Sequence, residues 1–191
     1  MVSGAQFHYW KRSCADWQYV RYGGGSMASM GARTRIPVAM SIPELEEDFP
    51  NLLTSRYAPK SPPDAKYNCI AFALGDTSHF WYDADVSGYY WPPGVPSADT
   101  LAGWIMVFSL HGYSETHDAS LEGDYEKIAI YATSQAPEHV ARQKASGVWI
   151  SKMGKGHDIE HDTLKALEGE MMGTVVTIMK RLCKDGRRVL E

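Results

Sequence analysis

The stretch KYNCIAFALGD, residues 66–76, contains a thiol at a position where it could act as a nucleophile. Cys69 follows Asn68 and opens a short apolar run that Gly75 ends, which predicts a short helix with the cysteine at its start. A helix N-terminus favours the thiolate, the nucleophilic form of cysteine, and the Asn68 amide and the Cys69 backbone N–H become candidate oxyanion donors. The alternative is that Cys69 is a buried apolar residue, the commonest environment of a free cysteine.

A thiol nucleophile works with a base, and His139 is the candidate. It opens a predicted strand that follows another strand, so in an antiparallel sheet its imidazole could face a helix packed on that sheet. Asp158 is the preferred third residue, because a carboxylate orients the ring and stabilises the imidazolium, and Ser151 and His161 are the other candidates. Two alternatives stay open: His139 as a surface residue and Asp158 as a helix N-cap.

Residues 76–96 are rich in aromatic residues, glycine and proline and show no clear period. Long irregular loops in compact domains are usually functional or disordered, and the many aromatic residues argue against disorder. Trp81 and Trp91 are therefore candidates to line a substrate entrance, with a packed lid as the alternative. Arg142 and Ser151 are further candidates to line the site, Arg142 by meeting a substrate carboxylate or by pairing with a neighbouring acid.

A zinc site is a third hypothesis. His157 and His161 lie four residues apart and would share one face of a helix, with His139 or Cys69 completing the ligand set. The metalloprotease pattern needs glutamate directly after the first histidine, where this chain has Asp158. We therefore expect no metal and no other cofactor.

Composition limits the classes of protein to consider. The chain has 191 residues, 44% hydrophobic and 22% charged, which suits one packed domain and a tail. The net charge of -4 makes a nucleic-acid partner unexpected. Three cysteines without metal spacing predict a reducing, cytoplasmic setting, and no apolar run has the length of a membrane span. We expect a peptide or amide substrate or a protein partner.

The chain divides into a Gly-, Ser- and Arg-rich extension, residues 1–36, and one domain, residues 37–191. Ser41 and Pro43 predict a first helix and Gly75 ends a second. Ser97 is a candidate cap for the clearest helix, residues 97–112. In that helix, four apolar residues follow helical spacing and predict a core-facing stripe: Leu101, Trp104, Ile105 and Phe108.

The second half of the chain has short apolar runs with β-branched residues. Four strands are predicted, over residues 126–132, 138–144, 147–154 and 173–183, with a short helix at 161–170. A glycine-containing turn at 145–147 predicts a hairpin. Helices followed by antiparallel strands indicate an α+β fold, with N-terminal helices packed on a small antiparallel sheet.

From Phe49 to Arg181 the sequence resembles a bacterial and fungal family of unknown function. The resemblance rests on several motifs of this chain: YNCIAFA (67–73), YWPPGVP (90–96), EKIAIYA (126–132), HVARQ (139–143), WISKMG (149–154) and DIEH (158–161). It covers nearly the whole domain and implies no activity.

A more distant similarity is to papain-like thiol hydrolases, including the CHAP-type amidases. It implies a papain-like fold and a Cys69–His139 pair. In many such amidases the histidine directly precedes a strand similar to KIAIY, where this chain has Lys127. The resulting hypothesis is a cysteine-dependent peptidase or amidase that acts through an acyl-enzyme, and its alternative is a non-catalytic binding module of the same fold.

Overall fold

The computed structural model describes residues 42–83, 88–134 and 136–183. The predicted extension over residues 1–36 and the Ser41 cap lie outside these ranges. In the described ranges, no helix combines the length and the apolar character needed to cross a membrane.

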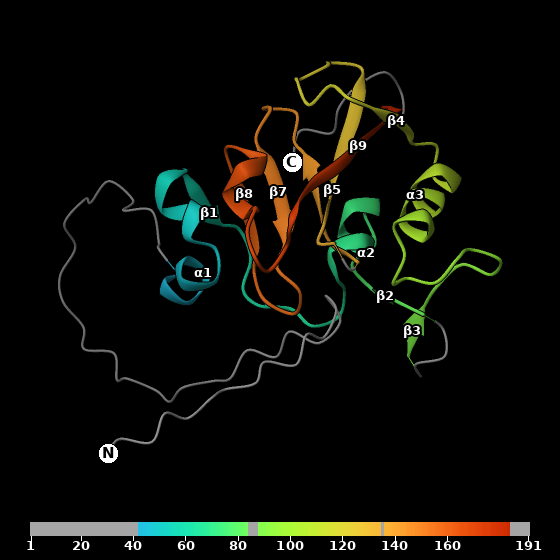
Figure 1. The fold of residues 1–191 in the computed structure, drawn as a ribbon, viewed down its shortest axis with the longest axis horizontal. Helices are drawn as coiled ribbons and strands as arrows, with labels where there is room; N and C mark the ends of the chain where they lie inside the picture. The colour runs from blue at the N-terminus through green and yellow to red at the C-terminus, as the bar shows by residue number, and fades with distance from the viewer. Residues whose placement is uncertain (1–41, 84–87, 135, 184–191) are drawn as a thin grey trace.

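The described chain is an α+β protein built on one seven-stranded sheet (Figure 1). Every neighbouring pair in this sheet is antiparallel. Across the sheet the strands are β1 (Tyr57–Pro59), β8 (Asp158–His161), β7 (Trp149–Lys152), β6 (Pro137–Gln143), β5 (Tyr125–Ala132), β9 (Thr174–Leu182) and β4 (Ser114–Thr116).

Short helices and a small ribbon complete the fold. The helices are α1 (Pro43–Asp48), α2 (Cys69–Leu74) and α3 (Leu101–Leu110), with 3-10 turns η1 (Pro50–Thr54) and η2 (Leu164–Leu167). The ribbon pairs β2 (Phe80–Trp81) with the parallel β3 (Tyr89–Tyr90). In Figure 1, α1 lies at the β1 end of the molecule and α3 at the opposite end.

The helix α2 begins where the sequence predicts. The Asn68 side chain caps it by accepting a hydrogen bond from the Ala71 backbone N–H at 3.2 Å. Gly75 ends it with a φ of 81°, a left-handed conformation that glycine adopts without a steric penalty. Cys69 is thus the first residue of the helix, as predicted.

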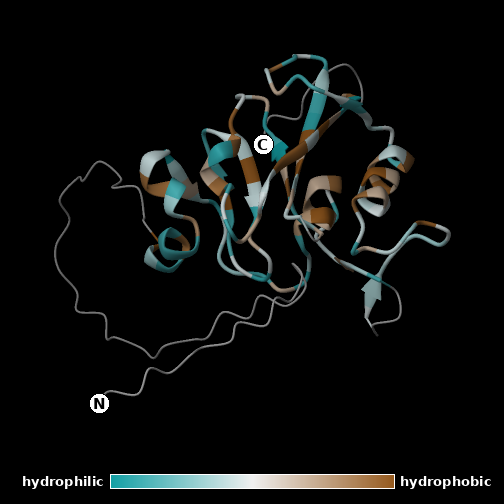
Figure 2. Ribbon diagram, in the orientation of Figure 1, coloured by the Kyte–Doolittle hydropathy of each residue, from teal (hydrophilic) through white to brown (hydrophobic). Residues whose placement is uncertain are grey.

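The helix α3 confirms the predicted stripe and corrects its cap. Thr100, not Ser97, accepts the capping hydrogen bond from the Gly103 backbone N–H at 3.0 Å. Trp104 and Phe108 are buried, and Leu101 packs against the same cluster. Figure 2 shows that the ribbons of α2 and α3 are largely apolar, because both helices pack on the sheet.

The sheet is larger than the sequence predicts. The four predicted strands correspond to β5, β6, β7 and β9, while β1, β4 and β8 were not predicted. The helix expected at residues 161–170 is replaced by the end of β8 and the turn η2. The ribbon β2–β3 lies inside the loop expected at 76–96, of which residues 84–87 are outside the described ranges.

Two apolar clusters cover the two faces of the sheet, because successive strand residues point to opposite faces. The α2 face carries Ile128, Ile130, Val140 and Met179 from the strands, packed with α2 and α3. The α1 face carries Ala129, Tyr131, Ala141, Ile159 and Ile178, packed with α1, η1 and η2. Any strand residue can therefore be assigned to a face from its register.

Candidate active site

The predicted pair of Cys69 and His139 is not formed, because the two side chains lie on opposite faces of the sheet. Cys69 belongs to the cluster on the α2 face. His139 pairs in register with Tyr131, which belongs to the α1 face, and their ring centroids are 5.6 Å apart. The histidine therefore has no access to the thiol across the intervening sheet.

A different set of polar side chains lies on the face of the sheet that holds the thiol. Lys152 ends β7 and Asp158 begins β8, and the register pairs them across the β7–β8 hairpin on the α2 face. Tyr67 reaches the same place from the segment before α2. We call Tyr67, Cys69, Lys152 and Asp158 the thiol cluster.

The polar contacts within the thiol cluster centre on Asp158. Its Oδ2 accepts a hydrogen bond from the Tyr67 hydroxyl at 2.9 Å. Its Oδ1 lies 3.9 Å from the Lys152 Nζ. The ammonium also donates to the Gly156 carbonyl and lies 4.8 Å from the centroid of the Tyr67 ring, a cation–π contact. These contacts hold Lys152 at a fixed point beside the start of α2.

The charges of the thiol cluster are coupled. Burial lowers the pKa of the Lys152 ammonium below its usual value, and the negative charges of Asp158, Asp64 and Cys69 oppose that shift. Cys69 is therefore within electrostatic range of Lys152. Burial and the hydrogen bond to Asp158 raise the pKa of Tyr67, so its hydroxyl stays protonated and continues to donate. A buried amine with a lowered pKa beside a thiol is able to accept its proton.

The predicted role of Asn68 as an oxyanion donor is not supported by its contacts. Its Oδ1 accepts from the backbone N–H groups of Ala71 and Trp81. Its Nδ2 donates to the Trp81 carbonyl at 2.6 Å. Asn68 thus fixes the start of α2 to β2, and we assign it a structural role.

The two tryptophans predicted to line an entrance are core residues. Trp81 and Trp91 are both buried within the cluster on the α2 face. Their indole N–H groups are satisfied internally, by the Asp76 carboxylate and by the Pro96 carbonyl. Of the two readings of this loop, packing against the core is the one that the tryptophan contacts support.

Arg142 lies on the α2 face near the helix but outside the thiol cluster. Its register partner is Ile128, and its guanidinium lies 5.1 Å from the centroid of the Phe72 ring. The predicted contact with a substrate carboxylate remains a prediction.

His139, Ser151 and His161 share the α1 face, away from Cys69. Ser151 and His161 are hydrogen bonded at 2.9 Å between Oγ and Nε2. The His161 Nδ1 lies 2.8 Å from the Thr163 carbonyl, so Nδ1 carries the proton and Ser151 donates to Nε2. Neither ring nitrogen of His139 has a hydrogen-bond partner among the described residues. Ser151 therefore does not line the thiol cluster, contrary to the prediction.

We predict that acidification destabilises the protein through His161. Burial, as the main cause, lowers its pKa to about 4, whereas the unfolded side chain titrates near 6.5. Between these values the unfolded state binds more protons, so stability is complete above pH 6.5 and falls as the pH drops toward 4. The loss approaches roughly 3 kcal/mol. Urea denaturation at several pH values measures it, and His161→Gln should flatten the dependence in this window; an unchanged slope in that variant would contradict the assignment.

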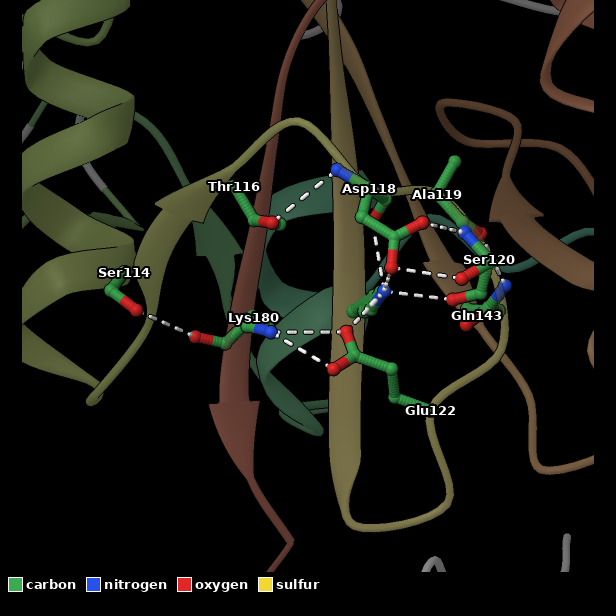
Figure 3. Close-up of polar contacts among 9 residues, drawn as sticks. Ser114, Thr116, Asp118, Ala119, Ser120, Glu122, Gln143 and Lys180 are labelled. Atoms are coloured by element: carbon green, nitrogen blue, oxygen red, sulfur yellow. Dashed lines mark hydrogen bonds and ion pairs between the residues drawn. The ribbon is translucent and has the colours of Figure 1, made fainter.

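Lys127, the residue found where many amidases place their histidine, has a structural role on the α1 face. Its ammonium donates to the carbonyls of Asp118 and Ser120 at 2.8 and 2.7 Å and pairs with the Glu122 carboxylate at 2.5 Å. Figure 3 shows Asp118, Ser120 and Glu122 grouped around this point, with Lys180 also reaching Glu122. The loop between β4 and β5 is thereby fastened to the sheet.

The two histidines whose spacing suggested zinc do not share a helix, because His157 directly precedes β8. His161 is the last residue of β8, and the His157 Nδ1 lies 2.7 Å from the Ser61 carbonyl. Within residues 42–83, 88–134 and 136–183, no group of three or more His, Cys, Asp or Glu side chains is arranged to hold a metal ion.

Sequence reasoning singled out Cys69 and Asp158, which lie on the same face of the sheet, but it paired Asp158 with His139 and did not predict the contacts of Asp158 with Tyr67 and Lys152. The signal for this contact in the sequence was the spacing of Lys152 and Asp158 around Gly154. Had residues 158–161 been recognised as a strand, the hairpin would have paired Lys152 with Asp158 directly.

The described chain is an α+β domain that carries a thiol at the start of a helix, and this helix packs against an antiparallel sheet. The chain belongs to the DUF7689 family, a domain of unknown function, whose model matches residues 59–180. No curated protein and no solved structure shows significant similarity to the chain.

Proposed function

We propose that this protein is a cysteine-dependent hydrolase of papain-like type that cleaves an amide or peptide bond. Cys69 is the nucleophile, and Lys152 replaces His139 as the proton acceptor. The observation that carries the proposal is the convergence of Lys152 and Asp158 on the α2 face, with the lysine ammonium in electrostatic range of Cys69. A helix-borne thiol packed on an antiparallel sheet is also the arrangement that papain-like hydrolases share.

The proposed reaction has two steps. The Cys69 thiol gives its proton to the Lys152 amine, the sulfur forms a bond to the substrate carbonyl carbon, and the C–N bond breaks as the leaving amine takes the proton from Lys152. Water then attacks the thioester, releases the acid and returns a proton to the sulfur. Asp158 and Tyr67 position the lysine, and the Cys69 backbone N–H at the helix start is the remaining candidate oxyanion donor.

The setting of the thiol is consistent with this chemistry. The proposed chemistry fits a reducing compartment such as the cytoplasm, where a cysteine stays a thiol. Cys69 is fully buried, and Asp158 is also buried, with 7% of its surface exposed. Hydrolysis at Cys69 therefore requires the cover over the thiol cluster to open for substrate.

Alkylation of the folded protein tests the proposal. Iodoacetamide should modify Cys69 with an apparent pKa below the ordinary thiol value of about 8.5, because Lys152 and the helix start favour the thiolate. Mass spectrometry of the Cys69 peptide separates it from Cys14 and Cys183. Modification that occurs only after unfolding would overturn the proposal, as would retention of every detected hydrolysis in Cys69→Ala.

The complete burial of Cys69 favours a second candidate, a non-catalytic binding module of the same fold. In that case Lys152 and Asp158 form a buried ion pair that stabilises the domain. Slow alkylation of Cys69, at the rate of global unfolding, is the result that this candidate predicts.

A further inference from the structure

One buried polar atom in the thiol cluster lacks a hydrogen-bond partner. Asp158 is 7% exposed, and its Oδ1 has no hydrogen-bond partner among the described residues. Its other oxygen accepts from Tyr67. A buried carboxylate oxygen without a hydrogen bond carries a desolvation cost, so such an atom is normally found where a donor can reach it.

The donor is not Lys152. Its Nζ lies 3.9 Å from Oδ1, which is an ion-pair distance but too long for a hydrogen bond. The ammonium is turned instead to the Gly156 carbonyl and to the Tyr67 ring. A cationic donor and an anionic acceptor thus stand side by side near the thiol, each with hydrogen-bonding capacity left for a ligand.

A carboxamide matches this pair, because one carbon atom carries both a carbonyl oxygen, which accepts a hydrogen bond, and a nitrogen, whose N–H donates one. We propose that Asp158 Oδ1 and Lys152 Nζ form a carboxamide-recognition site, in which Asp158 accepts the substrate N–H and Lys152 donates to the substrate carbonyl. This inference rests on the proposed function and narrows its substrates to primary amides, because a trans secondary amide points its N–H away from its carbonyl oxygen. Esters and tertiary amides lack the N–H.

The recognition site also places the reacting atoms. A carbonyl oxygen held by Lys152 turns its carbon toward Cys69, and the nitrogen held by Asp158 is the leaving group. For a primary amide the C–N bond breaks and ammonia leaves with the proton that Lys152 took from the thiol. The attacking and leaving atoms are then both within reach of the same lysine.

Two alkylating probes of matched chemistry test this site on the full chain. Iodoacetamide carries N–H donors, whereas 2-iodo-N,N-dimethylacetamide has the same carbonyl and leaving group but no N–H. The rate constants for Cys69 are each divided by the rate constants for glutathione at the same pH. We expect a ratio of about tenfold in favour of iodoacetamide, the value of one hydrogen bond to a charged acceptor.

Asp158→Asn is the matched variant, because it keeps the shape and an acceptor for Tyr67 but no longer presents a charged acceptor. Its ratio should fall by at least about fivefold, and any change in thiolate fraction cancels between the probes. Equal normalised rates in the wild type, or a preference that survives in Asp158→Asn, would overturn the carboxamide site while leaving the thiol proposal standing. Failure of both probes to modify folded Cys69 would overturn both.

Discussion

Replacing Lys152 with methionine is expected to slow the alkylation of Cys69 at pH 7 by about tenfold to a hundredfold. An opposite charge within a few ångströms typically shifts a pKa by one to three units, and methionine removes that charge while keeping the bulk of the side chain. The thiol pKa should therefore rise toward its ordinary value and the thiolate fraction should fall. The pH–rate profile for iodoacetamide measures the shift directly.

Lys152→Arg is the matched control for this experiment. It keeps a permanent positive charge, so the alkylation profile should stay on the acidic side of the ordinary thiol value. Cys183 is also buried, and its alkylation reports unfolding in each variant within the same sample. A methionine variant that stays folded by this criterion and keeps the wild-type profile would show that Lys152 does not influence the thiol.

Local signals in the sequence were sufficient to predict α2, which carries the thiol, and α3, which packs in the same apolar cluster. The apolar run after Asn68 and the Gly75 stop predicted α2, and the apolar stripe of α3 predicted its buried face. These features depend on neighbouring residues alone, so they are readable without the tertiary fold. The α+β class followed from the order of such elements.

The pairing of residues across the sheet was not readable in the same way. The sequence placed His139 at the start of a strand but did not fix which face its side chain takes, and a shift of one residue moves a side chain to the other face. The strand β8 has four residues, DIEH, with no β-branched run to mark it, and β1 and β4 have three each. Without β8, the Lys152–Asp158 pair has no visible basis.

The strand register also explains why polar residues that the sequence suggested as one site lie on two different faces of the sheet. Ser151 and Lys152 are adjacent in β7 and therefore point to opposite faces, one toward His161 and one toward Asp158. His139 and Asp158 are separated for the same reason. Several polar residues on inner strands can thus form two buried polar groups on opposite faces of one sheet. Only the register of the strands decides which group lies on the face that holds the thiol.

Gly173→Ala is expected to be the most destabilising single substitution considered, with a loss of roughly 4 kcal/mol or more in the free energy of unfolding. Gly173 has a φ of 72°, and an added Cβ would lie 1.8 Å from the Ala132 carbonyl oxygen. The three nearest atoms, two from Ala132 and one from Thr133, are all backbone, so neither a rotamer change nor a small displacement relieves the contact. The clash would separate the ends of β5 and β9, which pair Ala132 with Thr174.

Gly123→Ala provides the control, because its added Cβ would meet no atom within 4 Å and its φ lies outside the left-handed region. That variant should stay within about 0.5 kcal/mol of the wild type or gain slightly, since alanine reduces the freedom of the unfolded chain. Urea denaturation of the three proteins gives the comparison. A loss below about 1 kcal/mol in Gly173→Ala would contradict the close approach of the 169–173 turn to β5, and with it the β5–β9 register that assigns residues of the central strands to their faces.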